Sequence, residues 1–518
     1  MHALARGAVA AGLAYALSVA LRTTGDLKWP HDQDLYRDAA QATAFRDGHF
    51  LTDPLYCGET RWYNPLVPGV VGATARLTGR DPLLLYTRAG PALNLAAPMA
   101  FFVLTRALGG VGVAAVATLH FLFLKDPAVA SWSAATYSPW LFPRNFAQAP
   151  FYLALLALLR SWQHRRPRDF VIAGALLGIT FLAHTAPALV LGVLALAGFV
   201  RRPARPGAFA GLVLLLVTAL LVSLPFLVPI AARYKLVVKN PAPMEFNVEP
   251  YPHPVPAEVW IGTVVAALAA VSLLRPARRR ASAFLLLGWA GACLLLFAAC
   301  RTEDLLRARG VFAPAVVPEF HFMFLLHGAE SALFGWGLCR AGAALAHFLG
   351  RRATTAPALA LLGVLLLRPL GAYPARDDLG GARSHALRLL HVHRLDRLDL
   401  FGRDSWQVIR EHLQANARPR DVVLANAKNS LFIVGPTGRC VVAVADALAN
   451  PYADQAKRKR AQGRMMAQLR EGDGPGFRAL ATPLGVRWVL TDATEPVQPS
   501  AGLVLEAQAG EQTLWRVD

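Results

Sequence analysis

Long apolar runs separated by short polar connections fill the first 374 residues of this chain. Many of the runs reach about 18–25 residues, the length at which a helix crosses the ~30 Å hydrocarbon core of a bilayer. Nine single crossings are expected at about 4–21, 83–106, 111–124, 146–160, 208–230, 258–274, 282–300, 319–339 and 355–373. The pattern therefore predicts a mainly α, polytopic transmembrane helical bundle. We expect residues 4–21 to stay as a membrane anchor, because no small-residue cleavage site follows them.

The run 170–200 is too long for one untilted helix, and both of its ends are basic. We therefore expect two short helices in a hairpin, with a tip near 184–187 (His-Thr-Ala-Pro). Proline and polar residues are tolerated at membrane depth only where protein or a wet cavity surrounds them. The tip is thus expected to point into the protein near the outer face, and the hairpin raises the count to eleven crossings.

The basic residues gather in the connections between apolar runs. The chain has 53 Lys and Arg against 33 Asp and Glu, a formal net charge of +20, yet only 17% of its residues are charged. Clusters at 160–168, 201–205 and 275–280 follow the positive-inside rule. This placement argues against a nucleic-acid partner and predicts an amino terminus inside and a carboxyl terminus outside.

The character of the chain changes near residue 375. Residues 384–400 alternate apolar and basic side chains, which suits an amphipathic helix on the membrane surface. Residues 405–518 predict a soluble α/β domain that starts with a helix over 405–417, capped by Ser405. Further helices are expected near 454–470 and 475–483, strands over 421–425, 440–445 and 486–491, and a hairpin over 503–517. The predicted domains are 1–374, with an outer loop at 22–82, then a linker 375–404, then 405–518.

Five cysteines are too few for a disulfide scaffold. Cys293, Cys300 and Cys339 fall in apolar runs and are expected to be packing residues. Cys57 and Cys440 both map to the outer side. A disulfide between them and a pair of free thiols both stay open, because sequence gives no distance between the two residues.

The first outer loop concentrates acidic and aromatic residues. If a helix starts here, Asp32 and Tyr36 lie on one face, and Asp34 and Asp38 form a second pair with the same spacing. Neighbouring carboxylates can raise the pKa of one of them, which suits a general base. The structural alternative is a capping cluster, since acidic residues are favoured in a first helical turn.

Basic residues at other outer helix ends could bind an anion. We select Arg144, Lys235, Arg309 and His321 as the candidates. Contact with lipid headgroups, or a charged end extended toward water, is the alternative for each Arg and Lys. His327 and Glu330 lie within a predicted crossing, where ionisable groups are functional by default; a pair that satisfies itself is the alternative there.

The outer loop carries a resemblance to a known family. Its residues Asp32-Gln-Asp-Leu-Tyr36-Arg-Asp, then Asp47-Gly48, then Tyr63-Asn-Pro65-Leu66, resemble the first loop of GT-C polyprenyl-phosphate-sugar glycosyltransferases. Aminoarabinose transferases, protein O-mannosyltransferases and arabinofuranosyltransferases belong to this superfamily. Gln33 departs from the Glu of these relatives, and Asn64-Pro65 replaces a double proline. Residues 441–454 also look like bacterial members.

The resemblance implies roles for individual residues. The first-loop acid, Asp32 with Asp34 close behind, would act as the base of an inverting transfer. Basic residues at outer helix ends would hold the donor phosphate, a role that maps here to Arg144, Lys235 or Arg309. Beside what the resemblance implies, we expect His321 to help bind the phosphate and Tyr36, Tyr63 and His184 to contact substrate. Some relatives use a divalent cation (Mg²⁺, Mn²⁺ or Ca²⁺), for which Asp32, Asp34 and Asp126 could supply oxygen ligands.

These expectations describe an enzyme of the bacterial cytoplasmic (inner) membrane. It would move a sugar from a polyprenyl phosphate to a hydroxyl of a lipid-linked glycan, polysaccharide or protein on the outer face. A transporter or flippase of lipid-linked glycans is the first alternative, but it calls for ionisable groups through both leaflets, whereas those here gather at the outer side. A non-catalytic assembly subunit is the second alternative.

Overall fold

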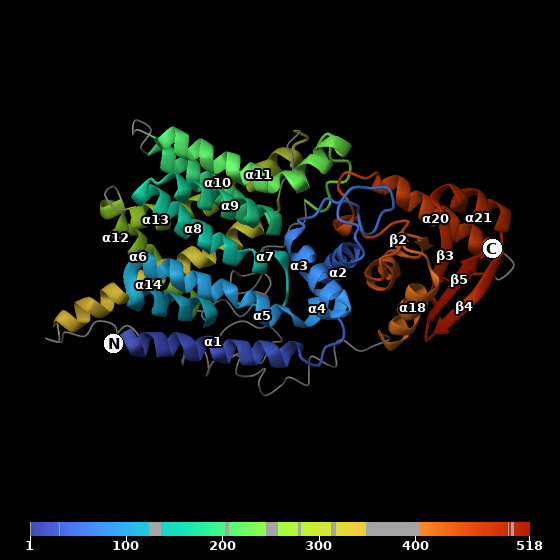
Figure 1. Cartoon of the computed structure of the whole chain (residues 1–518), viewed down its shortest axis with the longest axis horizontal. Helices are drawn as coiled ribbons and strands as arrows, with labels where there is room; N and C mark the ends of the chain where they lie inside the picture. Colours follow the sequence, from blue (N-terminus) through green and yellow to red (C-terminus); the bar gives the residue numbers. More distant parts are fainter. Residues whose placement is uncertain are drawn as a thin grey trace. The chain divides into compact units, whose positions relative to one another are not determined.

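The computed structural model describes residues 2–30, 32–123, 136–201, 207–244, 257–277, 281–311, 317–348, 403–495, 497–498 and 502–518 (Figure 1). The chain divides into two compact units. Unit 1 comprises Met1–Asp26, Arg88–Leu224 and Asn247–Leu395. Unit 2 comprises Leu27–Thr87, Pro225–Phe246 and Asp396–Asp518. The predicted crossing 355–373 and the predicted surface helix 384–400 lie outside the described residues.

Unit 1 is built from helices. Their bounds are α1 His2–Thr24, α5 Gly90–Asn94, α6 Ala96–Phe123, α7 Pro143–Phe146, α8 Gln148–His164, α9 Pro167–Ala183, α10 Thr185–Val200, α11 Ala208–Tyr234, α12 Ala257–Ala277, α13 Ala281–Ala308 and α14 Phe320–Phe348; α11 continues into unit 2. Within the described ranges, five helical stretches are long and apolar enough to cross a membrane: α1, Gly90–Phe123, α11, α13 and α14. A polytopic helical protein is thereby confirmed, and the count of eleven crossings stays a prediction.

The predicted hairpin is present as α9 and α10. The helices break at His184, whose backbone is extended (φ −163°, ψ 140°) and whose Nδ1 accepts a hydrogen bond from the Ala186 amide at 3.3 Å. Figure 1 shows α8, α9 and α10 side by side, in agreement with their packing. The predicted boundary between 83–106 and 111–124 falls at Gly110 inside α6, where φ of 86° favours glycine.

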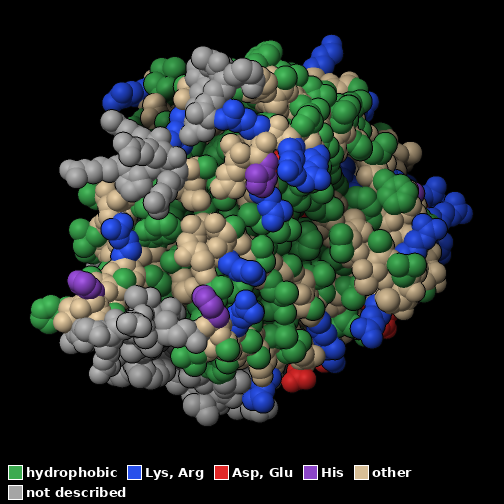
Figure 2. All heavy atoms as spheres, turned by 60° about the vertical axis from the view of Figure 1, so that its left-hand side comes forward, with side chains coloured by type: hydrophobic (Ala, Val, Ile, Leu, Met, Phe, Trp, Pro, Cys, Tyr) green, Lys and Arg blue, Asp and Glu red, His purple; other side chains and the backbone are tan. Residues whose placement is uncertain are grey.

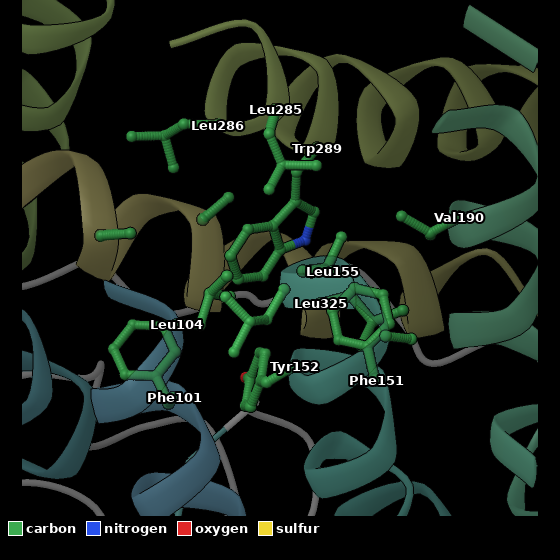
Figure 3. Packing of buried hydrophobic residues seen from close by; sticks show 14 of the residues in the cluster. Phe101, Leu104, Phe151, Tyr152, Leu155, Val190, Leu285, Leu286, Trp289 and Leu325 are labelled. Atoms are coloured by element: carbon green, nitrogen blue, oxygen red, sulfur yellow. The ribbon is translucent and has the colours of Figure 1, made fainter. Parts of the chain in front are cut away.

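Aromatic rings fill the centre of unit 1 (Figure 3). Trp289 of α13 is fully buried, with its ring centroid 5.5 Å from Phe151 and 5.8 Å from Tyr152, both on α8. Phe101 of α6 lies 5.1 Å from the Tyr152 ring. Such tilted and edge-to-face pairs add about 0.5–1.5 kcal/mol each beyond their buried area, so these rings fix how three helices pack.

Unit 2 combines the first loop with the carboxyl-terminal residues. The loop forms α2 Gln33–Arg46, α3 Leu66–Thr78 and most of α4 Pro82–Arg88. The carboxyl-terminal part forms α18 Arg403–Asn416, α19 Ala427–Asn429, η1 Ser430–Val434, η2 Gly435–Thr437, η3 Asp446–Leu448, α20 Gln455–Glu471, α21 Gly474–Ala481 and η4 Thr482–Leu484. Its strands are β1 Val422–Leu424, β2 Cys440–Val441, β3 Val486–Thr491, β4 Leu503–Ala509 and β5 Gln512–Val517.

The described strands form one mixed sheet in the order β2-β1-β3-β5-β4. β1 is parallel to β2 and β3, and the β4–β5 hairpin, turning at Gly510, is antiparallel to β3. This confirms an α/β arrangement at the carboxyl terminus. Two details of the prediction are wrong. Ser405 lies inside the first turn of α18 and bonds Gln512 instead of capping, and the second strand ends at Val441 because the chain then leaves the sheet.

Cys57 and Cys440 form a disulfide across 383 residues of sequence. The bond links the first loop to β2 inside unit 2. Of the described cysteines, Cys293, Cys300 and Cys339 are free. The open alternative of the sequence is thus resolved in favour of pairing.

Replacing both disulfide cysteines, Cys57→Ser with Cys440→Ser, is expected to lower the stability of unit 2 by about 2–4 kcal/mol, because the cross-link restricts the unfolded chain. Denaturant titration of the purified protein followed by tryptophan fluorescence measures the loss. Cys339→Ser, a change at a free cysteine, is the control. An equal stability of the double variant and this control would contradict the expectation.

Candidate active site

The candidate base lies at the start of α2. Asp32 is the capping residue of this helix: its backbone is extended, and its Oδ1 accepts a hydrogen bond from the Asp34 amide at 2.8 Å. An amide dipole and the positive end of the helix both favour the ionised carboxylate. The capping alternative is therefore present in the structure, and the catalytic role of Asp32 stays a prediction.

Arg37 joins two further acids of the same helix. Its Nη1 lies 3.2 Å from Asp34 Oδ1, while its Nε and Nη2 each donate to Asp38 Oδ1 at 3.0 Å. The Tyr63 ring covers the guanidinium, with its centroid 3.8 Å from Cζ. The Arg37 side chain is 7% exposed and the Asp34 side chain 35%, so a buried cation holds a partly exposed carboxylate in place.

Burial has the largest effect on the pKa values of Asp38 and Arg37. It raises the pKa of the Asp38 carboxyl to about 7, against the lowering effect of Arg37, and the charge of Asp34 raises it further. Burial would lower the pKa of Arg37, but Asp38, Tyr63 and Asp34 outweigh it, and the net direction is upward. Asp38 Oδ2 is buried and has no hydrogen-bond partner among the described residues. The group therefore keeps a permanent cation beside a carboxyl that titrates near neutral pH.

A polar network ties the rest of the loop to the carboxyl-terminal part of unit 2. Asp53 accepts hydrogen bonds from the Leu55 and Tyr56 amides and from Asn450 Nδ2, at 2.8–3.0 Å. The Tyr56 hydroxyl donates to Gln455 Oε1 at 2.6 Å. The bonds to Asn450 and Gln455 span nearly 400 residues of sequence, so no local pattern encodes these two contacts of the loop.

Two predicted substrate contacts lie in unit 2. The Tyr36 ring is buried, 4.7 Å from the Phe432 ring in an edge-to-face pair, and so helps pack α2 against η1. Tyr63 is half-buried on Arg37. The contact of both tyrosines with substrate stays a prediction. The position of Tyr63 beside the acidic group fits this prediction better than the position of Tyr36, whose ring is buried.

Three predicted site residues of unit 1, Arg144, His184 and His321, are brought together. The His184 and His321 rings stack with centroids 4.8 Å apart, and the charges of His184 and Arg144 both act on His321. Arg144 is buried, with its Cζ 5.7 Å from the Phe320 ring beside His321. Arg144 on α7, His184 at the α9–α10 break and His321 at the start of α14 thus form one polar cluster, which can bind an anionic group.

Other predicted residues lie apart or outside the description. Lys235 is exposed just after α11 in unit 2, and Arg309 is exposed just after α13 in unit 1. Asp126 lies outside the described residues. Within the ranges that the structure covers, no group of three or more His, Cys, Asp or Glu side chains is placed to hold a metal ion.

Comparisons with known proteins bear on the fold. No family model matches the chain, and no curated protein is similar in sequence. Among solved structures, apo ArnT from Cupriavidus metallidurans has a TM-score of 0.51 at 14% identity, over 99% of this chain and 98% of that one. The apo oligosaccharyltransferase of Archaeoglobus fulgidus has 0.52 at 13% identity, over 93% and 69% of the two chains. The chain has the GT-C fold.

A further ArnT structure, described as bound to undecaprenyl phosphate, has a TM-score of 0.50 and covers 98% of each chain. The resemblance stated from the first loop is thus confirmed for the fold. At 13–14% identity these likenesses say nothing of which residues act in this chain, so the roles above stay predictions.

The sequence predicts the pairing of Asp34 with Asp38 but gives no role to Arg37, which joins them. Adjacent Arg and Asp in an amphipathic helix usually face water, and only the burial of both side chains shows that they form one unit with Asp34. Arg61 was also passed over: it is buried, with its Cζ 3.6 Å from the Phe45 ring, and burial lowers its pKa to about 10. The signal in the sequence is that each arginine has an aromatic neighbour, Tyr36 or Trp62, in an acidic loop.

His327 and Glu330, the two ionisable residues of α14 singled out from the sequence, are paired with each other. His327 Nδ1 lies 3.6 Å from Glu330 Oε2, and Thr263 Oγ1 donates to Glu330 Oε1 at 2.7 Å. His120 of α6 bonds Ser331 Oγ at 3.0 Å. This arrangement agrees with the alternative in which the pair satisfies itself within the GT-C bundle.

Proposed function

We propose that this chain is a membrane glycosyltransferase. It takes a sugar from a polyprenyl-phosphate donor and transfers it to a hydroxyl of a lipid-linked glycan, polysaccharide or protein, on the outer face of the bacterial cytoplasmic membrane. One observation carries the proposal: a chain with the GT-C fold has a cluster of acidic side chains, ordered by a buried arginine, at the start of α2.

Asp32 is the proposed base. As the acceptor oxygen attacks the anomeric carbon, the hydroxyl proton passes to the carboxylate. The bond between that carbon and the donor phosphate breaks, and its electron pair leaves with the polyprenyl phosphate. Attack opposite the leaving group inverts the anomeric configuration. Asp34, held by Arg37, is proposed to orient the acceptor hydroxyl.

Arg144 and His321 are proposed to bind the donor phosphate, with His184 contacting the donor as well. A buried cation, Arg144, with hydrogen-bonding imidazoles beside it can stabilise charge that develops on a leaving phosphate. Lys235 and Arg309, both exposed, are proposed to guide the anionic donor toward the protein.

Arg144→Gln is expected to raise the KM for the donor by about tenfold or more, because hydrogen bonds to a charged group contribute about 1.5–3 kcal/mol. Steady-state transfer from a radiolabelled polyprenyl-phosphate sugar measures it. Arg106→Gln, at an exposed arginine of α6, is the control and should leave the KM unchanged. A similar KM in wild type and Arg144→Gln would remove Arg144 from the phosphate site.

A divalent cation and Arg37 are alternative counter-charges for Asp34. Because the guanidinium already lies 3.2 Å from this carboxylate, we expect most of the transfer rate to survive treatment with EDTA. Transfer is measured before and after chelation and after adding back Mg²⁺, Mn²⁺ or Ca²⁺. A rate that disappears with EDTA and returns with one ion would instead support a site built by Asp32, Asp34 and Asp126.

Ionisable groups within the helical bundle, His120 of α6 with His327 and Glu330 of α14, are the observation that favours a transporter as the second candidate. A transporter would move a fluorescent lipid-linked glycan across proteoliposome membranes without consuming it, whereas the proposed enzyme consumes the donor. A non-catalytic subunit would do neither.

A further inference from the structure

Unit 1 contains a cavity of about 110 Å³ that the proposed reaction does not use. Its apolar wall comes from α8, α9, α10, α11 and α13 and is formed by Leu158, Trp162, Phe170, Phe199, Leu212 and Phe284. The cavity lies where α8 and α10 end and where α9, α11 and α13 begin. Two arginines, Arg165 and Arg201, complete its lining.

Close packing of α10 on α8 leaves the residues of this wall few alternatives. A Cβ at Gly198 of α10 would lie 2.5 Å from the Trp162 ring, so only glycine lets this helix approach the indole. The Trp162 and Phe284 rings lie 5.4 Å apart. The rigid rings therefore leave a space between the helices that they cannot fill. Apolar cavities of similar size bind apolar molecules; for example, an engineered apolar cavity of ~150 Å³ in another protein binds benzene.

Both arginines are held at the cavity by local structure. Arg165 is the C-cap of α8, in the left-handed conformation (φ 57°), with its amide donating to Ser161 O at 3.0 Å. Arg201 follows α10, and its Cζ lies 4.4 Å above the Phe284 ring. Asp169, the acid of the α9 first turn, is engaged by His164 at 3.6 Å and by Arg168 at 3.9 Å. The lining thus pairs an apolar interior with two cations.

The surroundings are basic as well. Figure 2 shows Lys and Arg side chains spread over the side of the molecule that lies at the left in Figure 1, with few acidic side chains in view. The positive-inside rule predicts that the basic sequences 160–168 and 201–205 belong to the cytoplasmic side. Tryptophan beside arginine at the end of a membrane helix is typical of the membrane–water interface. Basic pockets between membrane helices bind anionic lipid headgroups.

We propose that this cavity is a binding site for an anionic glycerophospholipid, such as phosphatidylglycerol or cardiolipin. The phosphodiester is bound by Arg165 and Arg201, and the first methylenes of one acyl chain enter between Trp162, Leu212 and Phe284. The site is separate from the proposed donor site, because Arg144, His184 and His321 are not among its lining residues, and it does not depend on the proposed transfer reaction.

The test uses the full chain in nanodiscs containing phosphatidylcholine with one-tenth phosphatidylglycerol. The protein is then extracted into a non-ionic detergent, and retained lipid is quantified by mass spectrometry. Wild type should retain phosphatidylglycerol far above its share of the bilayer. Arg165→Gln with Arg201→Gln should lower retention by about 30-fold, from the attraction that two basic residues supply near an anionic lipid.

Two further variants make the test decisive. Arg160→Gln with Arg166→Gln removes the same charge from exposed residues of the same connection that do not line the cavity, and it should retain lipid as wild type does. Leu212→Trp fills the cavity without changing charge and should also lower retention. Equal loss in the Arg160/Arg166 control, or equal retention of phosphatidylcholine and phosphatidylglycerol by wild type, would overturn the proposal. If Leu212→Trp fails to fold, Ala195→Leu replaces it.

Discussion

Asp32→Asn is expected to lower the transfer rate by about 10²–10⁴-fold, the usual contribution of a general base. Asparagine caps helices as well as aspartate does, so the variant can still accept the Asp34 amide and α2 should start at the same residue. The loss should appear in kcat, with the KM for the donor near its wild-type value, because the base acts on the acceptor proton. Transfer from a purified polyprenyl-phosphate sugar measures both constants.

The matched control is Asp47→Asn, at the other end of the same helix. Asp47 is the C-cap of α2 and pairs with Arg46 at 2.7 Å. Its loss removes an equal charge from the same element, and transfer should continue at close to the wild-type rate. Full activity in Asp32→Asn would move the role of base to Asp34, and full activity in Asp34→Asn as well would remove the enzymatic proposal.

Arg37→Met should produce the largest loss of stability. The arginine is the buried partner of Asp38, whose side chain is fully enclosed, and breaking a buried ion pair by removing one partner costs about 3–5 kcal/mol. Arg46→Met is the matched control, because Arg46 also pairs with the next residue, but with side chains 28% and 33% exposed. Exposed pairs contribute about 0–1 kcal/mol. Similar losses in the two variants would contradict the account of the buried pair.

The loss in Arg37→Met should depend on pH. Burial raises the pKa of Asp38 to about 7 in the folded protein, above the 3.8 of a free aspartate. Between about pH 4 and pH 7 the folded chain therefore holds a proton that the unfolded chain has released, and the free energy of unfolding falls as pH rises through this window. Without Arg37 the ionised carboxylate has no cation, so the variant should lose more stability at pH 8 than at pH 5, as measured by denaturant titration at both.

Much of the fold could be predicted from the sequence because a helix that crosses the bilayer must be long and apolar. Length and hydrophobicity identified membrane helices, and two basic ends on one long apolar run predicted the break near His184. The cap at Asp32 followed from side-chain chemistry of one turn. Each of these features is local, since its cause lies within a few residues of its effect.

The contacts that shape the candidate site could not be predicted in this way. Asp53 meets Asn450, and Cys57 meets Cys440, across nearly 400 residues. The buried state of Arg37 and Asp38 depends on what covers α2, for which no local pattern exists. Ser405 was wrongly expected to cap because its partner, Gln512, lies 107 residues away. Long-range packing decided each of these outcomes.

The most direct measurement is the consumption of donor by the purified protein in proteoliposomes. A panel of polyprenyl-phosphate sugars carrying labelled hexoses and pentoses is supplied with acceptor lipids, and release of unglycosylated polyprenyl phosphate is followed by mass spectrometry. The account predicts release from at least one donor by wild type, with inverted configuration in the product, and a loss of at least ~10²-fold in Asp32→Asn. Release at the same rate by wild type and by Asp32→Asn with Asp34→Asn would contradict it.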